Sequence, residues 1–168
     1  MEPRVSIIMG STSDYKVMEA AAKTLNDFRI PFEINALSAH RTPEKAEEFA
    51  RNAAARGIKV IIAAAGMAAH LPGVIAAFTT LPVIGVPINA SLEGLDSIFS
   101  ILQMPPGIPV ATVAVNGAQN AAILAAQILA AGDPEVAGTV KQFKESLKNK
   151  IIQANEELKQ VKFEYKTN

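Results

Sequence analysis

Short apolar, β-branched runs alternate with helical patterns along the first 130 or so residues. Five such runs predict strands, at residues 5–9, 31–36, 59–64, 82–86 and 109–115. The helical patterns between and after them cover about residues 15–28, 43–56, 74–79 and 118–131. Strand–helix alternation favours a parallel sheet with helices on both faces. We therefore predict an α/β fold, a three-layer αβα sandwich whose five-stranded parallel sheet has the flavodoxin-like order 2-1-3-4-5.

The middle of the chain carries almost no charge. No residue between Lys59 and Glu93 is charged unless His70 is, and none is charged between Asp96 and Asp133. Repeated prolines, asparagines and glutamines interrupt these stretches, so they do not fit a membrane-spanning helix, whose backbone polar groups must be satisfied within the helix. An uncharged middle instead predicts burial on more sides than one domain provides, as at subunit interfaces.

The pattern changes at Asp133. Apolar residues then recur at spacings of three and four among lysines, glutamates and glutamines, which predicts one long amphipathic helix. The apolar stripe consists of Val136, Val140, Phe143, Leu147, Ile151, Ala154, Leu158 and Val161. The helix could pack on its own domain or lie as an arm over a neighbouring subunit. We expect a single domain, 1–168, with an αβα core at 1–132 and a C-terminal helical arm for subunit packing at 133–168.

Composition excludes several functions. The chain has no cysteine, which rules out disulfides and thiol chemistry. It has 16 basic and 16 acidic residues, so it lacks the excess of positive charge that is typical of proteins that bind nucleic acid or an anionic membrane. The N-terminus lacks the pattern of a signal peptide. We expect a cytoplasmic protein with no nucleic-acid or membrane partner.

In a parallel sheet, ligands bind beyond the carboxyl ends of the strands, near the switch in strand order. The loop after the first strand is Gly10-Ser11-Thr12-Ser13-Asp14. Small hydroxyl residues at a helix N-terminus offer donors to an anion, and the helix dipole favours it. The alternative is structural, since Ser13 or Asp14 could cap the next helix.

The second loop is Ser38-Ala39-His40-Arg41-Thr42-Pro43. An arginine suits bidentate recognition of phosphate, and a histidine can exchange protons near neutral pH. The alternative is an exposed histidine beside a surface arginine. Adjacent polar residues at the carboxyl end of a strand favour the functional interpretation.

The third loop, Ala65-Gly66-Met67-Ala68-Ala69-His70-Leu71-Pro72-Gly73, is nearly all small or apolar and could press its backbone against a flat ligand. His70 is its one ionisable group, and a lone histidine in such surroundings is more often structural. Two histidines without cysteine are too few ligands for a protein-made zinc site, and Asp14 is the one acidic residue of the three loops. We predict no metal and no cofactor.

Together these loops resemble motifs of the N5-carboxyaminoimidazole ribonucleotide mutase family, also called the catalytic subunit of phosphoribosylaminoimidazole carboxylase. The motifs occur in order at residues 10–14, 38–43, 68–73, 85–87, 94–97 and 103–105, and the resemblance covers roughly residues 5–131. Membership implies an isomerase of purine biosynthesis. It would convert N5-carboxyaminoimidazole ribonucleotide to its 4-carboxy isomer by decarboxylation and recarboxylation, as a homo-octamer with sites near subunit contacts.

The resemblance also implies a role for each site residue. His40 matches the general acid/base, and His70 matches a second active-site histidine. The residues that would hold the 5′-phosphate and nearby polar atoms are Ser11, Ser13, Ser38 and Arg41, in company with Gly10. Asp14 matches a residue that contacts the ribose hydroxyls. The loop from Gly66 to Leu71, which contains Ala68 and Ala69, matches the segment that encloses the aminoimidazole and its carboxylate.

Alternatives remain at the level of the reaction. The third loop resembles the mutase branch, whereas the branch that carboxylates aminoimidazole ribonucleotide directly with carbon dioxide has a different polar segment there. A non-catalytic flavodoxin-like nucleotide-binding module is another possibility. A flavin carrier would need aromatic residues that are scarce here, and a phosphoacceptor domain would need an aspartate at the end of the third strand. The chain departs from the family at Met67, where a second glycine is common, and in a short segment at 116–120.

Overall fold

A five-stranded parallel sheet forms the centre of the computed structural model, which describes all 168 residues. Its strands are β1 (Val5–Met9), β2 (Phe32–Ala36), β3 (Val60–Gly66), β4 (Val83–Ile88) and β5 (Ala111–Thr112). Their order is β2-β1-β3-β4-β5, and all four pairings are parallel. The predicted order 2-1-3-4-5 is therefore confirmed.

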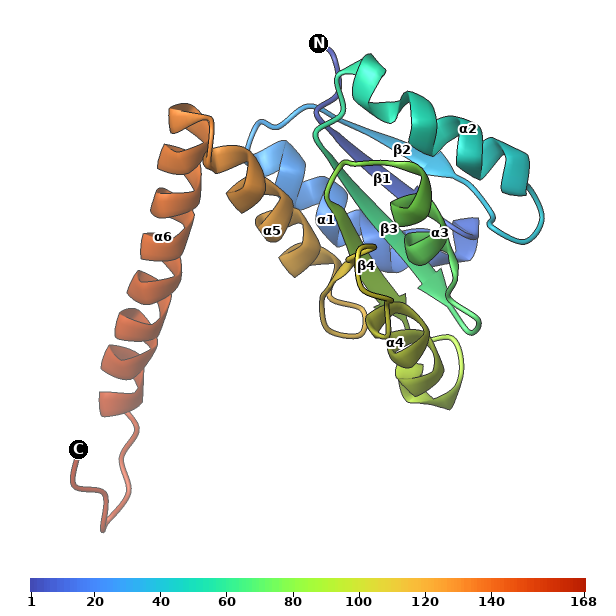
Figure 1. Ribbon diagram of the computed structural model, residues 1–168. Coiled ribbons are helices and arrows are strands. Elements are labelled where there is room, and N and C mark those ends of the chain that lie inside the picture. The colour runs from blue at the N-terminus through green and yellow to red at the C-terminus, as the bar shows by residue number, and fades with distance from the viewer.

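Helices cover both faces of the sheet, so the predicted three-layer αβα sandwich is also confirmed (Figure 1). One face packs against α1 (Tyr15–Asp27) and α5 (Ala118–Ala130), and the other against α2 (Pro43–Ala53), α3 (Leu71–Phe78) and α4 (Leu95–Leu102). The small residues of α5, five of them buried alanines, let it lie close to α1. The two apolar clusters lie on opposite faces of the sheet, because successive strand side chains point to opposite sides.

The central strands are buried on both sides. Every residue of β1 is buried, and so are the first six of β3. Continuous apolar runs such as Val60 to Ala65 are what a doubly covered strand requires. At the edge, β2 is only partly buried.

Three elements differ from the prediction. β5 spans two residues, whereas the sequence predicts a strand at residues 109–115. Pro109 has no N–H group to donate to a neighbouring strand. Beyond Thr112, only the N–H groups of Val113 and Asn116 still donate to carbonyls of β4, at 3.1 and 2.8 Å. α3 begins at Leu71, three residues earlier than predicted, because Pro72 fits the first turn of a helix.

The third difference is α4, which the sequence analysis left unassigned. The eight residues of this helix lie between Gly94, whose φ is 85°, and the proline pair at 105–106. α4 packs so closely on β4 that a Cβ at Gly85 would collide with Ile101. That close approach explains a glycine in the middle of a buried strand.

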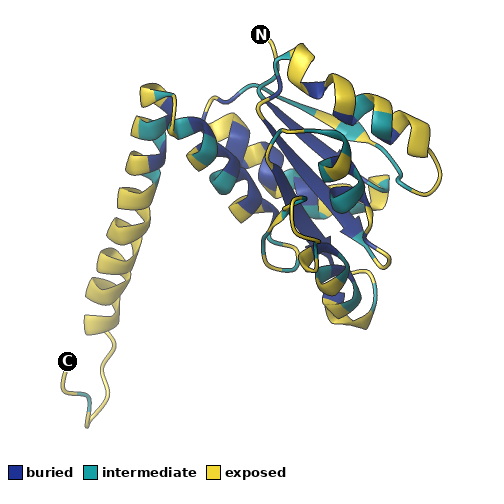
Figure 2. Cartoon of the chain, in the orientation of Figure 1, coloured by how far each residue is buried: buried dark blue, intermediate teal, exposed yellow.

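The last helix, α6 (Pro134–Lys159), has two parts. Its first turns pack on the core through buried Val136 and Val140, and Phe143 meets Phe28 edge-on at a centroid distance of 5.2 Å. Every helical residue after Phe143 is exposed, and the helix projects away from the body (Figures 1 and 2). The apolar stripe therefore continues beyond the core, with Leu147, Ile151 and Leu158 exposed by 44%, 66% and 57%.

None of the helices combines the length and the apolar character that crossing a membrane requires.

Asp133 fixes the start of α6 to the sheet. One carboxylate oxygen accepts hydrogen bonds from the Glu135 and Val136 N–H groups at 3.0 and 3.2 Å, and the other accepts one from Arg4 Nη1 at 2.8 Å. The Val136 N–H and the Arg4 guanidinium hold the pKa of this carboxyl below its usual range. The carboxylate is thus both the helix cap and the link to the strand region at Arg4.

Asp133→Asn should lower the free energy of unfolding at pH 7, because the amide oxygen can still cap the helix but the charge that faces Arg4 is lost. A carboxyl with a lowered pKa stabilises the fold above its unfolded pKa of about 4, and this stabilisation is lost as the pH falls through the folded pKa. Urea unfolding from pH 7 to 2.5, at one protein concentration, should show the wild-type advantage shrinking below about pH 4. Asp27→Asn, which changes a nearby carboxylate without a salt bridge, is the control. An advantage of Asp133 that stays constant with pH would contradict this account.

Candidate active site

Three loops meet beyond the carboxyl ends of β1, β2 and β3 and enclose an open hollow of about 560 Å³. The chain leaves β1 for α1 on one face of the sheet and leaves β3 for α3 on the other. That switch opens the crevice in which ligands of this fold class bind.

Ten of the twelve predicted site residues line this hollow. They are Gly10, Ser11, Ser13, Asp14, Ser38, His40, Arg41, Gly66, Ala68 and Leu71. The other two lie beside it. Ala69 is fully buried, and His70 contacts His40. The predicted residues thus form one group, although their roles remain predictions.

The first loop forms a compact group of oxygen atoms. The Ser13 hydroxyl lies 2.8 Å from Ser11 Oγ and 3.2 Å from Asp14 Oδ1. Ser11, not Ser13 or Asp14, is the capping side chain; it accepts the Ser13 N–H at the start of a short 3₁₀ turn, Thr12–Asp14. Asp14 precedes α1 without capping it. Burial raises the pKa of Asp14, against the opposing hydrogen bonds of Ser13 and Ser11.

Arg41 joins the first two loops. Its Nη2 donates to the Gly10 carbonyl at 3.1 Å, and its Nε lies 3.4 Å from Ser38 Oγ. The Ser38 hydroxyl also accepts the Arg41 N–H at 3.1 Å, and Thr42 closes the loop by bonding both backbone groups of Ser38. Arg41 makes no salt bridge and is exposed. A fixed guanidinium without a counter-ion, beside several hydroxyls, is suited to an anionic group such as phosphate.

The two histidines contact each other. His40 Nε2 lies 2.8 Å from His70 Nδ1, and the rings meet edge to face at a centroid distance of 4.9 Å. One imidazole must donate and the other accept, so the pair holds at least one proton between its rings. The sequence placed both residues at this edge of the sheet but gave no sign of the contact.

The third loop is tightly wound. The Met67 carbonyl accepts the Ala69 N–H at 2.8 Å, and the Ala68 carbonyl accepts that of His70, also at 2.8 Å. Met67 has a φ of 55°, which costs a residue with a side chain roughly 1–2 kcal/mol. Gly66 lies against the segment that follows β4, since a Cβ there would come within 2.9 Å of the Ala90 Cβ. These turns direct His70 toward His40.

Four further residues face the hollow, Ala39, Ala65, Met67 and Ala90. The first three lie in loops that the sequence had already indicated, although they were not among the twelve predicted site residues, and Ala90 was not predicted at all. Ala90 follows β4, so the rule that ligands bind beyond the carboxyl ends of strands could have identified it had the fourth loop been included. The alanines make this part of the lining apolar and short-chained.

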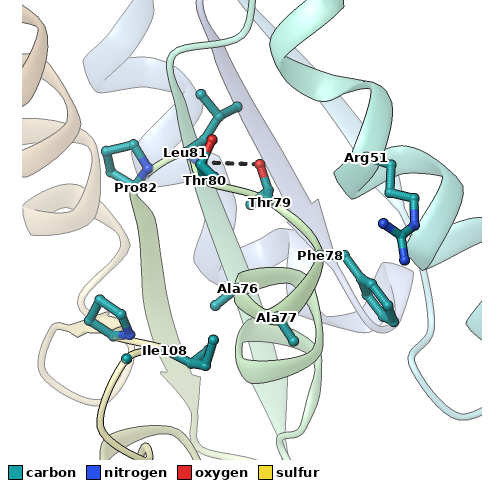
Figure 3. A pocket seen from close by; sticks show the side chains of 11 residues that line it. Arg51, Ala76, Ala77, Phe78, Thr79, Thr80, Leu81, Pro82 and Ile108 are labelled. Carbon is teal, nitrogen blue, oxygen red and sulfur yellow. Dashed lines mark hydrogen bonds between the residues drawn. The ribbon is translucent and has the colours of Figure 1, made fainter.

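A second hollow, of about 680 Å³, lies at the opposite edge of the sheet, around the end of α3 and the start of β4 (Figure 3). Its one charged residue is Arg51, which is paired with Glu47 at 2.8 Å and lies 4.9 Å from the centre of the Phe78 ring. The chemistry-bearing groups therefore gather at the first hollow. No three His, Cys, Asp or Glu side chains come together as a metal site would require.

The chain matches a known protein family over most of its length. The family model described as AIR carboxylase matches residues 4–150. The chain therefore belongs to the AIR carboxylase family.

Individual relatives cover nearly the whole chain. The N5-carboxyaminoimidazole ribonucleotide mutase of Thermotoga maritima is 58% identical over 160 residues, which are 95% of this chain and 94% of that protein. The protein of the same name from Pyrococcus abyssi is 59% identical over 147 residues, 87% of this chain and 84% of its own. Among solved structures, Treponema denticola PurE has a TM-score of 0.82 at 36% identity, covering 94% of this chain and 99% of that one.

Arg41→Lys should weaken the binding of ribose 5-phosphate about tenfold or more, because an ammonium can bond the Gly10 carbonyl but cannot present the guanidinium fork to an anion. Isothermal titration calorimetry measures this dissociation constant. Arg51→Lys makes the same change in the second hollow and is the matched control, for which we expect an unchanged constant. Equal affinities of the wild type and Arg41→Lys for ribose 5-phosphate would rule out this loop as the phosphate-binding site.

Proposed function

We propose that this chain is an N5-carboxyaminoimidazole ribonucleotide mutase, an isomerase that moves a carboxyl group from the exocyclic nitrogen of its substrate to ring carbon C4. The observation that carries the proposal is the pair of imidazoles of His40 and His70, at a hollow that is also lined by the unpaired Arg41 and by several small residues. Relatives of that name align over almost the full chain, which supports the same reaction here.

The hollow has the polarity that this substrate requires. The 5′-phosphate would bind at Arg41 with the hydroxyls of Ser11, Ser13 and Ser38, and the ribose hydroxyls would bond Asp14. The flat aminoimidazole would lie on the loop from Gly66 to Leu71, with its exocyclic nitrogen and C4 facing His40. Phosphate binding far from the reacting atoms then orients them, so binding energy lowers the barrier at the ring.

The reaction is a proton-neutral exchange of bonds. The carbamate nitrogen–carbon bond breaks, carbon dioxide leaves, and the nitrogen takes up one proton. C4 then attacks carbon dioxide with the electrons of the enamine, and the new carbon–carbon bond is completed when the C4 proton is removed. One proton is given and one is taken back, so a single acid/base can serve both steps.

We assign that acid/base role to His40. Because its Nε2 bonds His70 Nδ1, the second ring fixes the orientation of the first and provides a place to hold a proton between the two steps. No redox change or activated phosphate enters this balance, so neither a redox cofactor nor ATP is needed.

Two alternatives concern the same hollow. A direct carboxylase would add carbon dioxide to aminoimidazole ribonucleotide, and a non-catalytic module would bind the nucleotide without turnover. Fungal relatives named phosphoribosylaminoimidazole carboxylase are 50–51% identical, but this chain spans only 29% of their length. The third loop offers one ionisable group, His70, and so has little with which to collect either carbon dioxide or bicarbonate from solution. Carbon dioxide released from a bound carbamate needs no such partner.

The test compares both carboxyl donors on one preparation, with EDTA present and without ATP, biotin or flavin. We expect a much higher kcat/KM for N5-carboxyaminoimidazole ribonucleotide than for aminoimidazole ribonucleotide with carbon dioxide. His40→Asn should reduce kcat by about 10²- to 10⁴-fold while nucleotide binding persists.

The other outcomes are equally distinct. Faster direct carboxylation would assign the chain to the carboxylase branch. Binding of the nucleotide without any turnover would leave only the non-catalytic module. Loss of activity in EDTA that a metal ion restores would refute metal-free catalysis.

We further propose that the chain assembles as a homo-octamer in the cytoplasm, with α6 as the arm that joins the copies. The arm supports this proposal because its exposed stripe of Leu147, Ile151 and Leu158 has no covering element within its own chain. Burying an Ile or Leu side chain stabilises an interface by roughly 1.5–3 kcal/mol, and an octamer repeats that gain in every copy.

Ile151→Glu with Leu158→Glu should break the assembly into smaller species, because both residues lie on the exposed stripe, two turns apart. Ser146→Glu with Gln153→Glu adds the same charge at the same spacing on the opposite side of the helix and should leave the octamer intact. Sedimentation velocity at micromolar concentration measures the masses, and circular dichroism checks that α6 stays helical. A monomeric wild type would refute the octamer.

A further inference from the structure

Met67 lines the active-site hollow and is largely exposed to solvent, which places its side chain on the open side, here called the mouth. Two large aliphatic side chains line that hollow, Met67 and Leu71. Leu71 is 2% exposed and packs into the core below, whereas Met67 is 61% exposed. Met67 is therefore the one large apolar side chain of the lining that is free to move over the opening.

The backbone at this position is left-handed, with φ at 55°. A glycine would adopt that conformation at no steric cost, so a methionine here lowers stability for the sake of its side chain. Neighbours hold the backbone in place, since the Ala69 N–H bonds the Met67 carbonyl at 2.8 Å and Gly66 lies against Ala90. Only the side chain of Met67 is left to adapt.

The rest of the lining cannot retain a small uncharged molecule. Ala39, Ala65, Ala68 and Ala90 are short, and the hydroxyl and charged groups lie toward the first two loops. An unbranched thioether with three rotatable bonds can fold over an irregular opening and pack against a flat ring. Carbon dioxide has no charge for Arg41 or the histidines to hold, so its retention depends on steric closure.

We propose that Met67 is a retention residue, whose side chain closes over the bound ring and keeps released carbon dioxide in the hollow until C4 captures it. This inference rests on the proposed mutase function. In this proposal Met67 determines how much of the released carbon dioxide is captured by C4 and how much escapes, and it takes no part in making or breaking bonds.

The experiment uses the full-length chain with N5-carboxyaminoimidazole ribonucleotide and measures two products, the 4-carboxy isomer and the escaped aminoimidazole ribonucleotide. After subtraction of decarboxylation without enzyme, Met67→Gly should raise the ratio of escape to capture about 3- to 10-fold, the effect of losing a few apolar contacts. Turnover in isotopically labelled bicarbonate gives a second readout. Label should enter the product carboxyl in the variant and be nearly excluded in wild type.

Two variants separate closure from strain. Met67→Leu keeps apolar bulk at the mouth and should stay close to wild type in both readouts. Arg29 also has a left-handed backbone, with φ at 57°, but it lies near Asp133 and away from the active site. Arg29→Gly should relieve the same backbone strain and leave the ratio of escape to capture unchanged. Both glycine variants should unfold at or above the wild-type midpoint, so a leak in Met67→Gly alone is not a loss of folding.

The outcomes distinguish a failure of the retention role from a failure of the proposed mutase function. If wild type forms no 4-carboxy isomer, the mutase proposal itself fails. If wild type turns over and Met67→Gly matches it in escape and in label uptake, only the retention role fails. A leak that appears equally in Arg29→Gly would also overturn it, because the effect would then follow from general loosening.

Discussion

β1 and β3 lie side by side at the centre of the sheet, in register from Val5 opposite Val60 to Met9 opposite Ala64. Both are buried along almost their whole length, so their pairing is held by apolar burial on two faces as well as by the ladder. The chain then leaves them for opposite faces. The active-site crevice forms because the helices that follow these two paired strands pack on opposite faces of the sheet. The position of each site loop is therefore set by the pairing of β1 with β3.

Much of this arrangement could be predicted, because burial leaves a strong mark on sequence. Continuous apolar strands, and hydroxyls with Arg41 directly after them, placed the first two loops correctly. α4 was not predicted, and its position depends on Gly85 admitting Ile101 from another part of the chain, which no local pattern reveals. β5 was predicted too long because apolar residues continue past the point where the ladder ends. Periodicity reports burial and says little about pairing.

The active site also has features that could be predicted from the sequence and features that could not. Residues could be assigned to an edge of the sheet from their positions, but the contact between His40 and His70, thirty residues apart, depends on the tight turns at Met67 and Ala68. Backbone conformation of that kind has no signature in a sequence that lacks glycine there. α6 behaves likewise, since its stripe predicted one apolar face while only packing reveals that the face meets its own core as far as Phe143 and no further.

Charge and apolar surface are separated within the hollow, and the separation suits a reaction with a neutral intermediate. The chain as a whole has equal numbers of acidic and basic residues, yet Arg41 stands without a carboxylate partner where the phosphate would bind. On the other side, the alanines give no polar group that could bind water tightly near C4. An intermediate without charge gains nothing from Arg41 and is lost to solvent unless shape holds it. Orientation by a distant anion and confinement by apolar side chains, Met67 among them, are therefore separate tasks that are carried out within one crevice.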